Sequence, residues 1–99
     1  MTTHNDRIEI ENIASPGHVY RVDRRKYEAM RKALLVVVPE GMPGITVADA
    51  KRKLLPELPQ DLFPNGDKAG WWLKAAQLDL EAKGLLQREK TSPLRLFRP

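Results

Sequence analysis

The segment Lys68–Gly84, with the sequence KAGWWLKAAQLDLEAKG, decides the fold of this chain. Its apolar residues recur at helical spacing, and Gly84 suits the left-handed position that follows a helix C-terminus. We therefore expect a helix over Lys68–Lys83, capped at its N-terminus by Asp67. At about 100° per residue, its apolar side chains form two stripes on nearly opposite sides. The first stripe is Ala69, Leu73, Ala76 and Leu80, and the second is Trp71, Ala75, Leu78 and Ala82.

Two apolar stripes on one helix predict two packing partners. One is the body of the domain, and the other is either an N-terminal hairpin or a second subunit. Trp71 and Trp72 are expected to pack in the core, with base stacking or an intersubunit contact as alternatives. The polar residues form two narrow flanks, with Lys74, Gln77 and Glu81 on one side and Lys68, Asp79 and Lys83 on the other.

Hairpins are predicted at both ends of the chain. Residues 7–13 alternate apolar and polar side chains, residues 19–22 are β-branched and aromatic, and Pro16-Gly17 between them supplies a turn. After the long helix, residues 85–90 and 94–98 form a second predicted hairpin with its turn at residues 91–93.

Two further helices are predicted between the hairpins. Asp23 is a good N-cap for a helix that Pro39 ends, and Thr46 with Asp49 resembles the capping box of a second helix that stops near Leu55. The buried face is Tyr27, Met30, Leu34 and Val37 in the first of these helices and Val47, Ala50 and Leu54 in the second. Residues 56–66 contain three prolines and predict an irregular connection anchored by Leu58, Leu62 and Phe63.

Three helices followed by a C-terminal hairpin have the element order of a winged helix. We expect one α+β, winged-helix-like domain over residues 1–99, with an added N-terminal hairpin and with residues 1–6 disordered. The helix Lys68–Lys83 takes the place of the recognition helix, and residues 91–93 form the wing tip. The long connection 56–66 is a departure, because a helix-turn-helix usually turns in three or four residues.

Four runs in the C-terminal half resemble a known family. They are DLFP at 61–64, KAGWWLK at 68–74, QLDLEAKG at 77–84 and PLR at 93–95. They resemble a family of small bacterial proteins of about this length, classed as a domain of unknown function. The resemblance spans nearly the whole chain and supports these domain boundaries, but it implies no activity.

Positive charge gathers in two segments, which makes nucleic acid the leading predicted partner. The net charge is +4, but residues 24–39 alone carry five bases and one acid, and residues 85–99 carry four bases and one acid. Cations in the first turn of a helix oppose its dipole, and such rule-breaking positions concentrate at functional sites. The predicted contacts to double-stranded DNA are Arg24, Arg25, Lys26, Lys74, Arg88, Lys90, Arg95 and Arg98.

Other interpretations of the same residues stay open. The first-turn cations also fit a solvated run offset by Asp23 and Glu28, and an edge hairpin carries Lys and Arg to prevent edge-to-edge pairing. The alternative function is a protein-interaction or homodimerisation module, because a groove-reading helix should expose a polar face. Its interface is the second stripe, Trp71, Ala75, Leu78 and Ala82.

Enzymatic and metal-binding functions have little support. His4 and His18 have no second ligand at metal-like spacing, and Glu9 with Glu11 fits a solvated strand face. We expect no catalytic residue, metal, cofactor or small-molecule substrate. The chain has no cysteine, its start is unlike a secretory signal, and its longest apolar run, residues 33–38, is too short to span a bilayer. These features predict a cytoplasmic protein without membrane contact.

Overall fold

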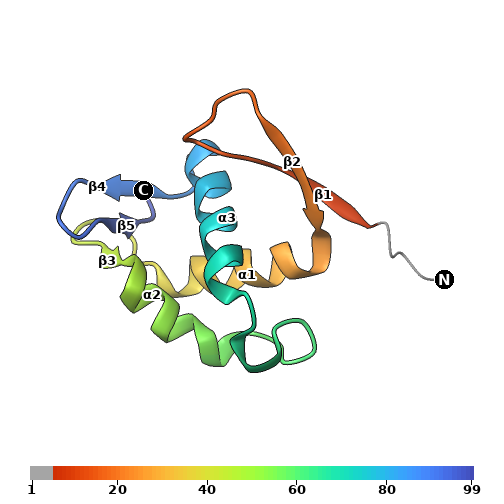
Figure 1. The fold of residues 1–99 in the computed structure, drawn as a ribbon. Helices are drawn as coiled ribbons and strands as arrows, with labels where there is room; N and C mark the ends of the chain where they lie inside the picture. The colour runs from red at the N-terminus through yellow and green to blue at the C-terminus, as the bar shows by residue number, and fades with distance from the viewer. Residues whose placement is uncertain (1–5) are drawn as a thin grey trace.

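The computed structural model of this chain describes residues 6–99, which form three helices and two small antiparallel sheets in an α+β arrangement (Figure 1). The expected disorder of residues 1–6 falls mainly on residues 1–5, which lie outside the described residues. In the described part no helix has the length and apolar character needed to cross a membrane. The helices and strands are β1 (Arg7–Glu11), β2 (Val19–Asp23), α1 (Arg24–Val37), β3 (Ile45–Thr46), α2 (Val47–Leu54), α3 (Ala69–Ala82), β4 (Gln87–Glu89) and β5 (Arg95–Phe97).

The N-terminal hairpin is confirmed. Strands β1 and β2 pair antiparallel, with Ile8 opposite Val22 and Ile10 opposite Tyr20. Cross-strand partners share one face of a sheet, so these four side chains form the inner face of the hairpin. The pairing aligns the apolar positions of the two strands, which is the register that the alternating pattern favours.

Helices α1 and α2 begin where their caps predict. The Asp23 carboxylate accepts a hydrogen bond from the Lys26 backbone N–H at 3.1 Å, and the Thr46 hydroxyl accepts one from Asp49 N–H at 3.2 Å. The Asp49 side chain does not complete a capping box, because it pairs instead with Arg52 at 2.8 Å. The connection 55–66 contains two short 3-10 turns, Leu55–Glu57 and Pro64–Gly66.

Helix α3 is confirmed, but its predicted cap is wrong. It begins at Ala69 rather than Lys68, and its N-cap is Lys68 in a left-handed conformation with no side-chain cap, so Asp67 does not cap it. At the other end Gly84 has a φ of 76°, and Leu85 N–H donates to Leu80 O at 2.9 Å. This bond is characteristic of a glycine-terminated helix, as predicted for Gly84.

The C-terminal hairpin is confirmed and belongs to a larger sheet. Strand β5 lies between β4 and a short strand, β3, that the sequence pattern does not predict. Gly44 allows β3 to approach β5, because a Cβ at this position would lie 2.3 Å from Leu96 O. The Gly44 N–H also donates to the Glu89 carboxylate at 2.8 Å, which ties β3 to β4.

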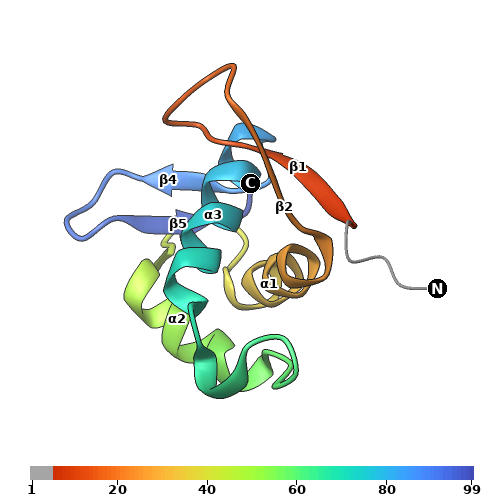
Figure 2. The ribbon, with the colours of Figure 1, turned by 45° about the vertical axis from the view of Figure 1, so that its right-hand side comes forward.

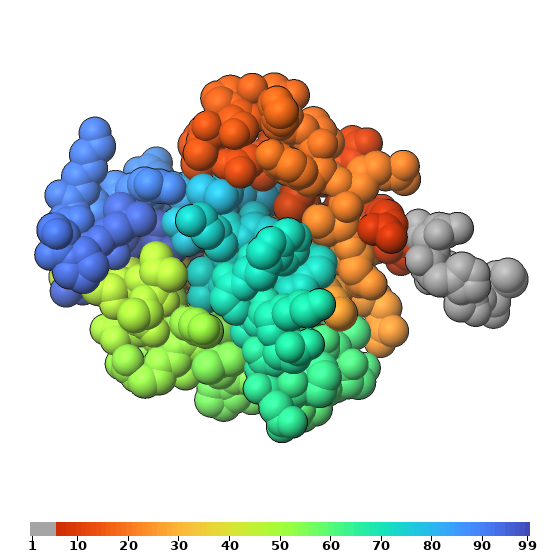
Figure 3. Space-filling view, viewed as in Figure 1, coloured from red at the N-terminus to blue at the C-terminus, as the bar shows by residue number. Residues whose placement is uncertain are grey.

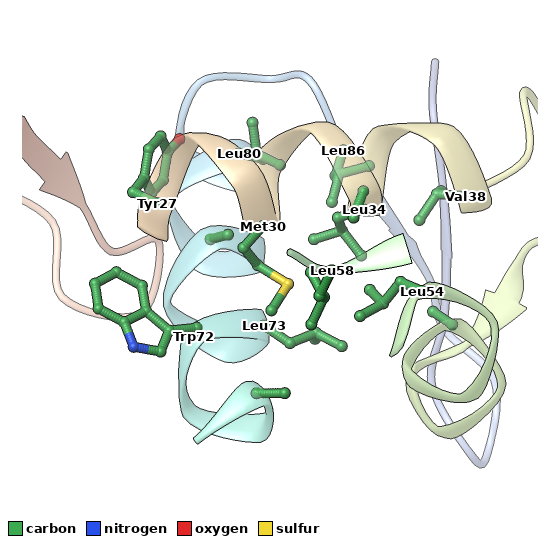
Figure 4. Packing of buried hydrophobic residues seen from close by; sticks show 14 of the residues in the cluster. Tyr27, Met30, Leu34, Val38, Leu54, Leu58, Trp72, Leu73, Leu80 and Leu86 are labelled. Atoms are coloured by element: carbon green, nitrogen blue, oxygen red, sulfur yellow. The ribbon is translucent and has the colours of Figure 1, made fainter. Parts of the chain in front are cut away.

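The core lies between the helices and is closed by the C-terminal sheet. Met30 and Leu34 of α1 face Leu73 and Leu80 of α3 (Figure 4). Leu86 and Leu96 close the core at the C-terminal sheet. The first apolar stripe of α3 is therefore fully used in packing, and all four of its residues are buried: Ala69, Leu73, Ala76 and Leu80.

The polar flanks of α3 are partly buried. Asp79 has no exposed surface, and its carboxylate accepts hydrogen bonds from Glu11 N–H at 2.8 Å, from the Tyr27 hydroxyl and from Lys83 Nζ. This carboxylate therefore joins β1, α1 and α3. Every buried side-chain nitrogen or oxygen in the described residues has a hydrogen-bond partner.

Glu81 plays the corresponding role on the other flank. It is buried, it pairs with Arg88 of β4, and it accepts a hydrogen bond from Gln77 Nε2 at 3.0 Å. Since Arg88 Nη2 adds a second contact at 3.2 Å, the guanidinium engages both carboxylate oxygens. Helix α3 thus binds the N-terminal hairpin through one acid and the C-terminal sheet through another.

We expect Tyr27 to ionise only as the protein unfolds. Burial, together with the hydrogen bond to Asp79, raises the pKa of the Tyr27 phenol well above its ordinary value of 10.0. As the pH rises, the Tyr27 phenol loses its proton at a lower pH in the unfolded chain than in the folded one. The free energy of unfolding therefore keeps its full value below a pH of 10.0 and falls as the pH rises above it. In a Tyr20→Phe variant, tyrosinate absorbance should rise together with the loss of helical ellipticity. Absorbance that rises while ellipticity is intact would contradict the burial.

Candidate functional site

The two adjacent tryptophans have opposite environments. Trp72 is 8% exposed and packs edge-on against Phe63, with ring centroids 6.4 Å apart. Trp71 is 59% exposed, and its ring contacts Trp72 edge-on at 5.0 Å. The prediction of core packing is therefore confirmed for Trp72 and wrong for Trp71. Leaving an indole in water forgoes a large amount of apolar burial, so an exposed tryptophan marks a candidate contact site.

Trp71 lies on a groove between the N-terminal hairpin and α3, hereafter the hairpin groove. It has a volume of about 490 Å³ and includes Gly70 in its lining. In the space-filling view α3 reaches the surface between the hairpin and α2 (Figure 3). Its apolar lining is Ile10, Tyr20 and Val22 from the hairpin with Trp71, Ala75 and Leu78 from α3, and its polar lining includes Glu11, Asn12, Arg21 and Lys74.

The second apolar stripe of α3 therefore has an incomplete cover. Ala75, Leu78 and Ala82 are half-buried, and only the Trp71 end of the stripe is largely exposed. The N-terminal hairpin is one of the two packing partners that the sequence allowed. It covers the stripe toward its C-terminal end, where Ile13 N–H donates to Leu78 O at 3.3 Å.

The hairpin is fixed to α3 along β1. Glu11 N–H donates to Asp79, and the Glu11 carboxylate lies 3.7 Å from Lys83 Nζ. Strand β2 has no comparable contact with α3, although Tyr20, Arg21 and Val22 line the groove. One wall of the groove is therefore a strand that α3 does not hold directly.

The charged groups on the groove are unequal. Glu11 has Lys83 as a partner, whereas Arg21 and Lys74 have no ion-pair partner within residues 6–99. Both cations are exposed. The groove is therefore apolar at its centre and positive at its margin.

The predicted phosphate contacts in the first turn of α1 are largely occupied within the chain. Arg24 Nε lies 2.8 Å from the Asp6 carboxylate and its Nη1 lies 3.7 Å from Glu28, while Arg25 Nη2 lies 3.4 Å from Asp61. The hydrogen bond to Asp6 raises the pKa of Arg24 above its ordinary value. Lys26 has no side-chain partner among the described residues. Internal acids therefore account for two of the three cations that oppose the helix dipole.

The predicted contacts in the C-terminal hairpin are occupied in the same way. Arg88 binds the buried Glu81, and the hydrogen bond to this carboxylate raises the pKa of Arg88. Arg95 Nη1 donates to Gly44 O at 3.0 Å, and Arg98 Nε donates to Val38 O at 2.8 Å. Of this predicted set only Lys90 lacks a side-chain partner in residues 6–99.

The two basic segments do not come together. Arg98 binds Val38, at the C-terminal end of α1, whereas Arg24 and Arg25 lie in its first turn. A helix of 14 residues separates them, which is about 20 Å. The C-terminal sheet and the start of α1 accordingly lie on opposite sides of the molecule in both ribbon views (Figures 1 and 2).

Sequence reasoning identified the α3 side of the groove and missed the hairpin side. The second stripe of α3 pointed to Trp71, Ala75 and Leu78, but Tyr20 and Val22 were only strand residues. The alternating pattern could have shown that Ile10, Tyr20 and Val22 share a face, but not what that face meets. Within residues 6–99 no group of three or more acidic or histidine side chains is placed to hold a metal ion.

We expect Arg88 and Lys90 to differ sharply in their contribution to stability. Arg88→Ala removes both N–H donors of the guanidinium and leaves the buried Glu81 carboxylate with only Gln77, which should cost about 1–2 kcal/mol in the free energy of unfolding. Lys90→Ala also removes one positive charge, but from an exposed position, and should change the free energy of unfolding by less than about 0.5 kcal/mol. Urea denaturation measures both. Equal effects would show that the Glu81–Arg88 pair contributes nothing.

Comparison with known proteins gives a family but no function. A family model described as "Family of unknown function (DUF6958)" matches residues 7–96. Neither a search of curated proteins nor a search of solved structures returned a match. The matched span begins with β1 and reaches β5, so it includes the N-terminal hairpin and both walls of the groove.

Proposed function

The chain belongs to this family of unknown function, and we propose that it is a protein-interaction module of winged-helix type that binds its partner in the hairpin groove. The observation that carries the proposal is the position of Trp71. This side chain is 59% exposed on the margin of an apolar groove in a domain whose other tryptophan is buried. Tryptophan is among the residues that most often dominate the energy of protein–protein contacts.

The strand order supports the winged-helix assignment. The order α1, β3, α2, α3, β4, β5 places one short strand between the first two helices, and this strand pairs with β5 at the edge of the C-terminal sheet. A winged helix has this arrangement of three helices and a small sheet. The N-terminal hairpin is the addition, and it supplies one wall of the proposed binding site.

The internal contacts of the arginines favour a protein partner over nucleic acid. A phosphate contact needs a cation that is free to leave its present acceptor. Arg24, Arg25, Arg88, Arg95 and Arg98 all have internal acceptors. The hairpin groove, in contrast, offers apolar surface that no described residue covers.

Selection from a random peptide library tests the proposal. Peptides enriched on the wild-type domain should bind the groove, and Trp71→Ala should weaken their binding by about tenfold or more because it removes the exposed apolar anchor. Val36→Ala is the matched control, because Val36 is 71% exposed on α1 and does not line the groove. Fluorescence anisotropy with labelled peptides measures each affinity.

Two results would contradict the proposal. One is a library that yields no enriched peptide. The other is a set of peptides whose affinities fall equally in the Trp71 and Val36 variants. Thermal melting of both variants establishes that a loss of binding does not come from unfolding.

Nucleic-acid binding remains a second candidate, supported by the cations without side-chain partners in residues 6–99. Of the predicted DNA contacts, the cations that lack such a partner are Lys26, Lys74 and Lys90. If these three contact phosphates, log K for a random duplex against log salt should have a slope of about −2.7. Lys90→Ala should reduce the magnitude of that slope by about one, and Glu9→Gln should leave it unchanged. Absence of duplex binding at about 50 mM salt would exclude this candidate.

A further inference from the structure

Two features meet at the hairpin groove: an apolar lining and a strand with an open edge. From them we infer that the partner contributes an extended segment that pairs with β2 as a third strand and places alternate apolar side chains in the groove, with acidic residues between them. This inference rests on the proposed function, because it names the chemistry and conformation of the partner at the same site.

The open edge belongs to β2. This strand pairs only with β1, and Val19–Val22 make no other backbone hydrogen bond in the described chain. In an antiparallel pair, alternate residues direct their N–H and C=O groups away from the partner strand. The outer edge of β2 therefore presents unpaired donors and acceptors in a row, which is a template for an added strand.

The edge has little protection. Proteins commonly block an exposed edge with proline, charged side chains or a bulge. Strand β2 contains no proline, lysine or bulge in its regular five-residue register with β1, and its central charge, Arg21, opposes another basic strand but not an acidic one. Val19 is 54% exposed and Tyr20 is 42% exposed. The outer edge of β1 is not open in the same way, because the Glu11 N–H and the Ile13 N–H just beyond the strand donate to α3.

The groove lies against the inner face of this strand. Tyr20 and Val22 point from the inner face of β2 into the groove. A strand added beside β2 extends the same sheet, so every second side chain of that strand lies on this face too. Those side chains would meet Trp71 and Ala75 on the opposite wall, and they should be apolar.

The charge of Arg21 selects acidic residues for the remaining positions. Arg21 lies on the outer face of β2, where the other alternate side chains of an added strand would lie beside it. It is exposed, and although Glu9 of β1 lies opposite it in the register, the two form no ion pair. Carboxylates on the outer face of the added strand therefore have a complementary cation beside them, whereas Lys74 lines the groove on the other face.

A second copy of this chain fits the edge less well. Arg21 is the middle residue of β2, so two-fold pairing of the whole strand with β2 of a second copy would place the two Arg21 side chains opposite each other. Directly opposed like charges destabilise a strand pair. The charge pattern therefore favours a different chain, one with acidic residues.

The test uses labelled synthetic peptides of alternating Glu and Val or Phe, held at trace concentration so that they do not pair with one another. The acidic peptide should bind the wild-type domain, and the same peptide with Lys in place of Glu should bind at least tenfold more weakly. Arg21→Ala should abolish this preference. Lys32→Ala is the matched control, because it removes the same charge from an exposed position on α1 outside the groove.

Backbone N-methylation tests the added strand directly. Two isomers of the acidic peptide carry N-methyl groups on either all apolar or all acidic residues. In an added strand only one of these sets directs its N–H groups toward β2. One isomer should therefore lose at least tenfold in affinity while the other binds like the parent. Equal affinities of the two isomers, whether retained or lost, would overturn the inference.

The remaining outcomes separate this inference from the proposed function. In two outcomes library peptides depend on Trp71 but the acidic peptide either does not bind or binds as a helix by circular dichroism. Either result supports the protein-interaction module and overturns the inference of an added strand. If no peptide depends on Trp71, both are wrong. A homodimer by light scattering that Trp71→Ala dissociates would identify a second copy as the occupant and overturn the inference.

Discussion

The carboxylate of Asp79 is the interaction on which the arrangement of this domain depends. It has no exposed surface, and its hydrogen-bond donors come from β1, from α1 and from α3 itself. Without it, the Tyr27 hydroxyl and the Glu11 N–H would each lack an acceptor, at a cost of about 1–3 kcal/mol for each buried group. The same bonds hold β1 against α3. The arrangement of the hairpin groove therefore depends on one acid, near the C-terminal end of α3, that is buried rather than solvated.

The helices and hairpins could be predicted because their signals are local. The caps at Asp23 and Thr46 and the glycine at Gly84 act within a few residues, and the structure confirms them. Strand β3 could not be predicted, because two residues carry no periodicity and its position depends on Gly44 meeting a strand about fifty residues later. The N-terminus of α3 was misplaced because Asp67, a favourable cap by residue type, precedes the left-handed Lys68.

The site was only partly predictable because its chemistry depends on long-range partners. Asp79 and Glu81 occupy polar positions on the helical wheel, and nothing in the local pattern distinguishes a solvated acid from one that binds Tyr27 or Arg88. The arginines pose the same problem in reverse. Arg98 binds the carbonyl of Val38, the residue after α1 and 60 residues away in sequence, so a residue that looked available to phosphate is part of the fold. The second apolar stripe of α3 was the one functional signal that local periodicity could provide.

The contrast between Trp71 and Trp72 has a spectroscopic consequence. An indole in water emits at longer wavelength than one in an apolar environment, and a dissolved quencher such as iodide reaches only the exposed ring. In this domain Trp72 is shielded and Trp71 is accessible, but excitation passes between the two rings because their centroids lie only 5.0 Å apart. Since Trp71 lines the groove and Trp72 lies in the core, variants that keep only one indole report the occupancy of the groove or the integrity of the fold.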